Sequence, residues 1–408
     1  MSPVLHFDII SLIIDIVGES NDTNLLKELA LVSHSFHQLC SKHLFATIEL
    51  ANFNREGLVA PPKKGFVKLL RSRPDVVKYI RNLKYFCNKS KLFSTTHPSF
   101  NNFNNDDRLL SSILPNLLRT ISRLNCLKIV TYRQDWNEMD SSLTSAFLYL
   151  MHLPTINHID LSSIYNFPLS SLTLSINLLR LDIHYVDPLE EETVVHSEMM
   201  PKIREFRTSG STLLTTKLLH TKKQDGQPAF DFTDLRRLSI CLQDEQNIRY
   251  LLQNAKLLEK LHLSVGPGES LLRLCDILSP IARTLKVLDL TLPLPLAGLY
   301  EGLEVIAGHN MLESLSFQVE FDAGGGGVYE TEDSLGSEFQ RVEKVILVKP
   351  GWSALKQISF NVLFACWDNN PNLKLYKTLL QSLPDKYLSH LSKLESITFS
   401  YSSSFLTV

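Results

Sequence analysis

One short pattern, apolar-x-x-apolar-x-apolar, recurs along most of this chain and limits the folds open to it. The first copy is Ile80–Tyr85 and the last is Leu394–Phe399. Copies begin at residues 80, 124, 156, 178, 203, 235, 258, 285, 312, 355 and 394. Alternating apolar residues are typical of a strand that is buried on one face. A single copy could arise by chance, but eleven in order predict a series of similar strands.

The segments between the copies carry the spacing of amphipathic helices. Ile248, Leu251 and Leu252 lie at i, i+3 and i+4, and Leu143 and Phe147 repeat this spacing. Strands and helices that alternate in units too small to bury their own apolar faces must stack on one another. We therefore expect an α/β fold with a parallel sheet over residues 76–408.

The intervals between copies resemble those of leucine-rich repeats, whose period is roughly 20 to 29 residues. Some intervals here are longer, so the resemblance implies an irregular solenoid with its parallel sheet on the concave face. A doubly wound α/β domain is the competing arrangement, but no glycine-rich phosphate loop follows the first strand.

The predicted strands also indicate a surface that could bind a partner. Strand side chains alternate between faces, so the residue between the last two apolar positions of each copy points to the concave side. We call these residues the polar row: Lys84, Lys128, Asp160, Asp182, Arg207, Ser239, His262, Asp289, Ser316, Ser359 and Thr398. Two interpretations remain open, a face that binds a target protein and a solvated face without a partner.

Composition excludes several classes of partner and compartment. The formal net charge of −2 gives no bulk attraction to nucleic acid. No apolar run is long enough to span a membrane, and the N-terminus lacks the basic residues of a signal peptide. The six cysteines are far apart, which favours reduced thiols over a disulfide framework. We expect a cytoplasmic or nuclear protein that binds neither membrane nor nucleic acid.

A row of possible zinc ligands, His34, His37, Cys40 and His43, lies near the N-terminus. On a helix the first and last would be roughly 13.5 Å apart along the axis and would point to opposite sides. They cannot converge on one tetrahedral ion. We therefore expect no metal site and no cofactor, with the histidines facing solvent.

Apolar residues around these histidines have helical spacing. Leu25, Leu29, Val32, Phe36 and Leu39 form an apolar stripe that predicts an inner face, while Leu31 points away from it. A second set of apolar residues with helical spacing lies upstream: Leu5, Ile9, Leu12, Ile13 and Ile16. Two such helices cannot bury these residues alone and need a third helix or a partner.

The same residues resemble an F-box of the fungal type. Leu5–Val17, followed by a polar turn and Leu26–Phe36, is similar to the family pattern Leu-Pro-x-Glu-Leu-x-x-x-Ile and a later Leu-Val-x-x-x-Trp/Phe. The resemblance covers roughly residues 4–50. It implies a helical module that binds the Skp adaptor of a cullin–RING ubiquitin ligase. By position, the adaptor contacts would be Leu5, Ile9, Ile13, Leu26, Leu31, Val32 and Phe36.

We thus expect an F-box-like module over residues 1–50, a linker over 51–75 and the repeat region beyond it. The resemblance implies a substrate-recognition subunit of a Skp–cullin–F-box ligase, with a target protein that the sequence does not identify. The alternative is a repeat scaffold without a ligase role, in which the first helices only cap the solenoid. No catalytic motif was found, so we expect no enzyme activity of the chain itself.

Overall fold

The computed structural model describes fifteen segments of the chain: residues 7–20, 22–50, 54–55, 58–59, 63–87, 113–190, 199–241, 245–266, 274–294, 296, 299–308, 310–322, 332–347, 351–366 and 373–407. The chain divides into two compact units. The first comprises Met1–Lys202 and His220–Phe230, and the second comprises Ile203–Leu219 and Asp231–Val408. The predicted boundary at residues 51–75 stays a prediction.

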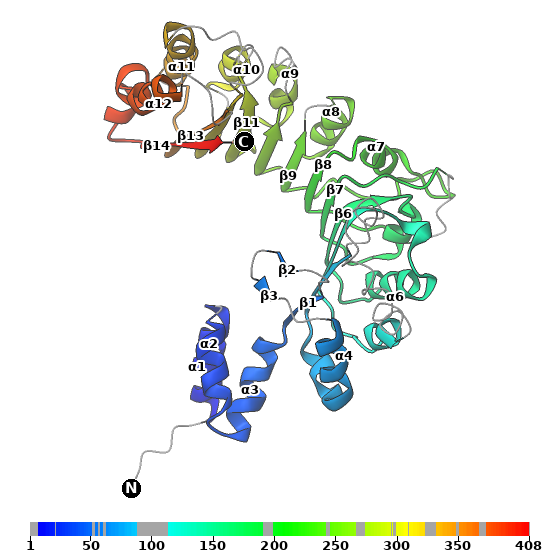
Figure 1. Cartoon of the computed structure of the whole chain (residues 1–408). Coiled ribbons are helices and arrows are strands. Elements are labelled where there is room, and N and C mark those ends of the chain that lie inside the picture. The colour runs from blue at the N-terminus through cyan, green and yellow to red at the C-terminus, as the bar shows by residue number, and fades with distance from the viewer. Residues whose placement is uncertain are drawn as a thin grey trace, which may run out of the picture. The chain divides into compact units, whose positions relative to one another are not determined.

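The first unit begins with three helices and continues into a sheet (Figure 1). Its helices are α1 (Phe7–Glu19), α2 (Thr23–Ala30), α3 (His34–Leu44), α4 (Lys63–Ser72) and α6 (Ser141–Met151), with short 3₁₀ turns η1 (Pro74–Tyr79), η4 (Trp136–Glu138) and η5 (Leu169–Leu174). Its sheet strands are β1 (Thr47–Leu50), β4 (Asn82–Phe86), β5 (Cys126–Asp135), β6 (His158–Tyr165) and β7 (Arg180–His184). The order β1-β4-β5-β6-β7 is parallel throughout, and β2 (Asn54–Arg55) and β3 (Leu58–Val59) form a separate antiparallel pair.

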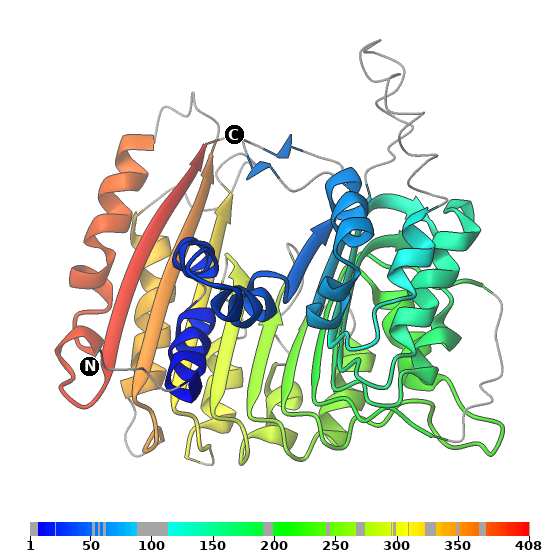
Figure 2. The ribbon, with the colours of Figure 1, turned by 90° about the horizontal axis from the view of Figure 1, so that it is seen from below.

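The second unit alternates strands and helices, and its strands run side by side in chain order (Figure 2). The strands are β8 (Glu205–Ser209), β9 (Arg237–Cys241), β10 (Lys260–Ser264), β11 (Val287–Pro293), β12 (Ser314–Asp322), β13 (Gln357–Cys366) and β14 (Thr398–Thr407). The helices are α7 (Thr212–His220), α8 (Glu245–Asn254), α9 (Leu274–Leu278), α10 (Leu299–Ile306), α11 (Glu332–Leu347) and α12 (Leu373–Tyr387), with 3₁₀ turns η7 (Ser279–Ile281) and η8 (Leu391–Lys393). All neighbouring strands are parallel.

The prediction of an α/β fold with parallel strands is confirmed. Ten of the eleven copies of the apolar pattern begin two residues before a strand begins. In β10, for example, Leu261 and Leu263 are fully buried while the residues between and beside them are partly or fully exposed. The predicted helices also form, with Ile248 and Leu251 buried on α8 and Phe147 buried on α6. The buried alternate residues of the strands pack against the buried stripe of each helix, and these contacts hold the sheet and the helices together.

The last strand departs from its predicted register. The copy at Leu394–Phe399 begins four residues before β14 rather than two. Thr398 therefore pairs with Gln357, and Ser400 takes the place beside Ser359 that the sequence assigned to Thr398. Phe399 and Tyr401 are the apolar residues that match Ile358 and Phe360. Thr398 does not belong to the polar row, and Ser400 does.

A helix also occupies part of the segment expected to be a linker. In α4 the side chains of Phe66, Val67 and Leu70 are buried, which is the i, i+1, i+4 spacing of a helix face packed on a core. Two prolines and a glycine near its start suggested an irregular connection. The buried stripe outweighs them, so this part of the linker is ordered structure.

Candidate functional site: exposed apolar helices and a polar strand face

The three N-terminal helices share a small apolar core. Its buried members are Ile14 of α1, Leu26 of α2 and Cys40 of α3. Ile10, Val17, Leu29, Phe36 and Leu39 are among the partly buried residues that pack around them. Three short helices with so few buried residues have little to hold them together by apolar contacts alone.

Capping residues set the ends of α2 and α3. The Asp22 side chain accepts a hydrogen bond from the backbone N–H of Leu25 at 3.0 Å, and the Ser33 hydroxyl accepts one from Phe36 N–H at 3.3 Å. Ser33 has an extended backbone, so the chain breaks between α2 and α3. The predicted stripe Leu25–Leu39 assumed one continuous helix. Because the break turns α3 away, Leu25 and Val32 are exposed instead of lying on an inner face.

Polar contacts fasten α1 to α3. Asp15 forms ion pairs with Lys42 Nζ at 2.6 Å and with His43 Nε2 at 2.7 Å. The hydrogen bond from Lys42 is the main cause that holds the pKa of Asp15 below its usual value, against partial burial. Gly18 leaves room for the imidazole of His43, because a Cβ at Gly18 would overlap the His43 ring.

The histidines are therefore not all turned to solvent as predicted. His43 is partly buried against α1, and His37 Nε2 lies 3.2 Å from Arg73 Nη1 beside η1. His34 is exposed and contacts Gln38 on its own helix. Within the part of the chain that the structure describes, no three His, Cys, Asp or Glu residues could hold a metal ion.

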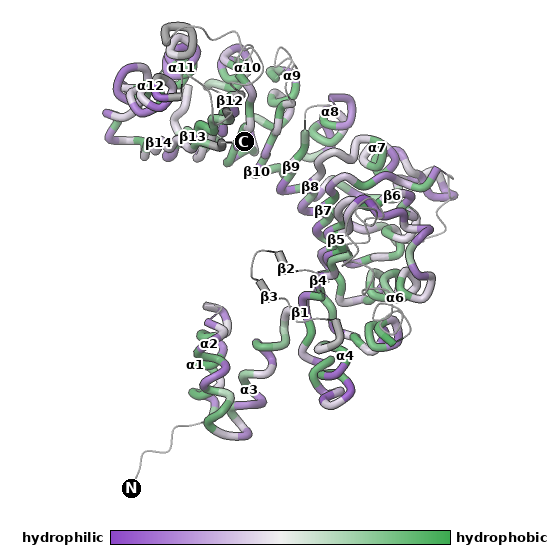
Figure 3. Tube along the Cα trace, viewed as in Figure 1, coloured by the Kyte–Doolittle hydropathy of each residue, from purple (hydrophilic) through white to green (hydrophobic). Residues whose placement is uncertain are grey.

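Many large apolar side chains of these helices are exposed. Eight large hydrophobic side chains are exposed within residues 7–32, out of twenty in all the described segments. We call them the N-terminal apolar surface: Phe7, Ile9, Leu12, Ile13, Ile16, Leu25, Leu31 and Val32. Leu31 and Val32, between α2 and α3, are 87% and 65% exposed. Figure 3 shows hydrophobic residues along α1 in green. Many large apolar residues left in water within one short segment are typical of a region that binds a partner.

The predicted adaptor contacts divide between this surface and the core. Ile9, Ile13, Leu31 and Val32 are exposed, whereas Leu26 is 2% exposed and packs inside the helices. Phe36 is partly buried against the same core, so it supports the helices more than it offers a contact. Leu5 lies outside the described residues.

The predicted adaptor contacts left out Phe7, Leu12, Ile16 and Leu25. The sequence analysis had grouped Leu12 and Ile16 with Ile9 and Ile13 by their helical spacing, and it had assigned Leu25 to an inner face. The apolar residues of α1 spread over more than half of the helix circumference, so spacing alone could not tell which part of them faces α2 and α3.

Strand register aligns the remaining residues of the polar row within each unit. In the first unit Lys84 pairs with Lys128, Lys128 with Asp160, and Asp160 with Asp182. In the second unit the aligned residues are Arg207, Ser239, His262, Asp289, Ser316, Ser359 and Ser400. Within each unit the structure thus brings the predicted residues other than Thr398 into one line across neighbouring strands.

Charges in the first unit's part of the row are paired internally. Lys84 Nζ lies 2.5 Å from Glu49 Oε1 on β1, and Lys128 Nζ lies 2.5 Å from Asp160 Oδ2. Arg180 Nη2 lies 2.7 Å from Asp182 Oδ2. Such neutralised pairs leave little net charge for a partner to recognise.

The second unit's part of the row is less charged and more varied. Burial lowers the pKa of His262 and raises the pKa of Asp289 beside it. Both shifts favour the neutral forms. The Ser359 hydroxyl donates to Ser316 Oγ at 2.8 Å. Small polar groups with few fixed charges suit hydrogen bonding to a protein surface better than ion pairing.

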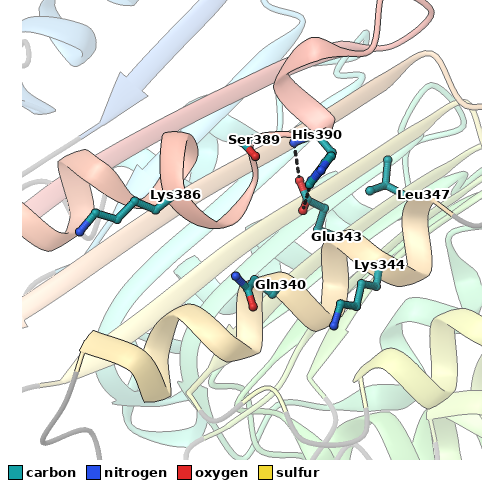
Figure 4. A pocket seen from close by; sticks show the side chains of 7 residues that line it. All are labelled: Gln340, Glu343, Lys344, Leu347, Lys386, Ser389 and His390. Carbon is teal, nitrogen blue, oxygen red and sulfur yellow. Dashed lines mark hydrogen bonds and ion pairs between the residues drawn. The ribbon is translucent and has the colours of Figure 1, made fainter.

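A hollow of about 230 Å³ lies beside α11 and the end of α12 (Figure 4). Its most buried group is the Glu343 carboxylate, which accepts hydrogen bonds from the backbone N–H groups of His390 at 2.8 Å and Leu391 at 3.1 Å. Lys344 and Lys386 point in different directions along its rim (Figure 4). Because Glu343 satisfies backbone groups at the turn after α12, its role is to join the two helices.

Comparison with known proteins does not assign this chain to a family. The chain matches no protein-family model and no curated protein. Among the described residues, none of the helices has the length and apolar character needed to cross a membrane.

Proposed function

We propose that this chain is the substrate-recognition subunit of a Skp–cullin–F-box ubiquitin ligase. In this proposal α1–α3 form an F-box that binds the Skp adaptor. The strands and helices of the two units form an irregular leucine-rich-repeat-like solenoid whose polar row binds a target protein. The chain would work inside the cell, in the cytoplasm or nucleus.

The observation that carries the proposal is the N-terminal apolar surface. Its residues combine high exposure with a small underlying core, which fits a helical module that completes its packing on a partner. Each Leu, Ile or Val buried on docking would contribute roughly 1.5–3 kcal/mol. A few such residues are enough for a stable complex.

The chain's contribution to ubiquitination would be proximity. Other subunits of the ligase carry the chemistry, and a bound target would hold its lysine near the activated ubiquitin. The second unit's polar row, with Ser239, His262 and Ser316, offers hydrogen-bonding groups for that target. This assignment needs no catalytic residue in the chain.

Co-purification with the Skp adaptor tests the proposal. The full chain should retain the adaptor, and Leu31→Asp or Val32→Asp should weaken retention by about tenfold or more, because each places a charge in an apolar contact. Leu213→Asp is the matched control, since Leu213 on α7 is 55% exposed and lies in the other unit. It should bind normally.

Two results would overturn the adaptor assignment. One is a folded full chain that does not bind the adaptor at all. The other is binding that survives charged substitutions at both Leu31 and Val32. A chain that bound a target protein without the adaptor would instead be a repeat scaffold without a ligase role.

A further inference from the structure

Three side chains from neighbouring strands of the first unit form a hydrogen-bonded chain. Cys126 Sγ on β5 lies 3.2 Å from His158 Nδ1 on β6. The other ring nitrogen, His158 Nε2, lies 3.1 Å from Asp182 Oδ2 on β7. Arg180 Nε and Nη2 also donate to the Asp182 carboxylate, at 3.1 and 2.7 Å from Oδ2. A thiol, an imidazole and a carboxylate in this order are the arrangement that activates a cysteine nucleophile.

Strand pairing fixes this arrangement. Cys126 pairs with His158, and His158 pairs with Arg180, so the three share one level of the sheet. Asp182 lies two residues beyond Arg180 and therefore on the same face. Because these positions lie on hydrogen-bonded strands and not on loops, the thiol and the imidazole are held at a constant separation.

The charges around His158 favour its protonated form. Burial lowers the pKa of His158, but hydrogen bonds to Asp182 and Cys126 outweigh it and raise the pKa to about 9. Burial raises the pKa of Asp182, but hydrogen bonds from His158 and Arg180 bring it down to about 2. At neutral pH both ring nitrogens of His158 then carry a proton. Nε2–H donates to Asp182, and Nδ1–H donates to Cys126 Sγ, which must accept it.

The other groups that face Cys126 carry little net charge. Asn82 is its register partner on β4 and is uncharged. Lys84 and Lys128 lie one level along the same face, but each is paired with a carboxylate, Lys84 with Glu49 and Lys128 with Asp160. The hydrogen bond from His158 is therefore the contact that favours a reactive sulfur at Cys126.

Cys126 is also reachable. It is partly exposed, whereas Cys40 in the helical core is fully buried. From this geometry we propose that Cys126 is a nucleophile activated by His158 and a site of oxidation by hydrogen peroxide. The inference does not depend on the proposed ligase role.

The reaction balances with groups at the site. The Cys126 thiolate attacks one oxygen of the peroxide, an S–O bond forms and the O–O bond breaks. Sulfur loses two electrons to the peroxide and becomes a sulfenic acid. The hydroxide that leaves takes the Nδ1 proton of His158, which gives water and a neutral imidazole. Asp182 and Arg180 act as positioning residues, since they hold the ring and touch neither sulfur nor peroxide.

Acyl transfer fits this site less well than oxidation. Hydrolysis through a cysteine needs free N–H groups to bind an oxyanion. Here the backbone N–H of Cys126 donates to Arg81 O at 3.0 Å and that of His158 donates to Asn125 O at 3.0 Å. The strand ladder occupies these donors, so the site lacks this element of a hydrolase.

The test is peroxide oxidation of the full-length native chain with dimedone present to trap sulfenic acid. Trypsin releases Cys126 in the peptide Leu124–Lys128 and Cys241 in Leu238–Arg249, so mass spectrometry can follow both. Cys241 is the internal control because it is also partly exposed on a parallel strand. At pH 6.5 we expect the Cys126 adduct to form about tenfold faster than the Cys241 adduct.

Alkylation by iodoacetamide gives the second readout. At pH 6.5 Cys126 should react about tenfold faster than Cys241, because His158 donates a hydrogen bond to its sulfur. His158→Gln should remove this advantage. Equal rates at Cys126 and Cys241 in the native wild-type chain would overturn the proposal. This outcome does not require that a variant fold.

Discussion

The three N-terminal helices and the sheet of the second unit are both rich in Leu and Ile, yet they place these residues in opposite environments. In β10 and β11, Leu261, Leu263, Leu288 and Leu290 are all buried. In α1, only Ile14 is buried, while Ile9, Leu12, Ile13 and Ile16 remain in water. A parallel sheet with helices packed on it buries every second residue, but three short helices have nothing to cover their outer side.

The comparison indicates where each region gains its stability. Sheet strands are held by apolar ladders and by backbone pairing along their length. The helices depend more on caps and on the Asp15–Lys42–His43 contacts, and they keep their apolar side chains available for a partner. Substitutions of the same kind should therefore have different effects in the two regions.

The largest contrast should come from leucine truncation. Leu288→Ala on β11 removes a fully buried side chain and should lower the free energy of unfolding by about 3 kcal/mol. Leu31→Ala removes a side chain that is already in water and should change the free energy of unfolding by less than about 0.5 kcal/mol. Urea unfolding followed by circular dichroism measures both. Equal losses would mean that Leu31 is packed in solution.

The next effect tests the polar face of the first unit's sheet. The pKa of His158 is raised from 6.5 to about 9, so the stability it contributes is fully present below pH 6.5 and is lost as the pH rises through 9. Between pH 6.5 and 9.5 the free energy of unfolding should fall by about 2 kcal/mol more in the wild type than in His158→Gln. The Asp182 contribution, present above pH 3.8 and lost toward pH 2, does not change in this window. Parallel pH profiles for the two proteins would contradict the assignment.

A smaller effect on stability is expected for Gly18→Ala. Here the direction of the change is informative. Alanine in a helix interior normally stabilises by roughly 1 kcal/mol relative to glycine. Here the added Cβ would meet the His43 ring, so Gly18→Ala should instead destabilise α1–α3 by about 1–2 kcal/mol. Hydrogen exchange of the α1 amides reports this locally. In a His43→Ala background, which lacks the ring, Gly18→Ala should no longer lower the protection of the α1 amides. An equal loss in both backgrounds would exclude the ring contact as the cause.

The smallest effect concerns the cap between α2 and α3. Ser33→Ala removes the side-chain acceptor for Phe36 N–H and should cost about 1 kcal/mol, measured by faster amide exchange in α3. Ser35→Ala, an exposed serine two residues further along the same helix, is the matched control and should have little effect. Equal exchange in the two variants would show that Ser33 does not set the start of α3.

Sequence reasoning was most successful where the spacing of apolar residues is compatible with only one secondary structure. The spacing of Leu258, Leu261 and Leu263 predicted β10 because only a strand buries alternate residues. It failed at β14, where Leu394 and Ile397 imitate the pattern but are only partly buried. There the true register depends on which residues fit beside Ile358 and Phe360 on the neighbouring strand.

The candidate sites show the same limit. The N-terminal apolar surface was predicted in outline, but the side of α1 that faces inward could not be known until Ile14, Leu26 and Cys40 were placed together. The Cys126–His158–Asp182 chain was not predicted. Its members lie 32 and 24 residues apart in sequence, and only the parallel register brings them together.

Hydrogen–deuterium exchange of the full chain, with and without the Skp adaptor, tests the central claim most directly. The account predicts that adding the adaptor slows exchange in α1 and from Leu31 to Phe36, and leaves the strands β8–β14 unchanged. Slower exchange along β8–β14 with no change in α1–α3, or no change anywhere in the presence of saturating adaptor, would contradict it.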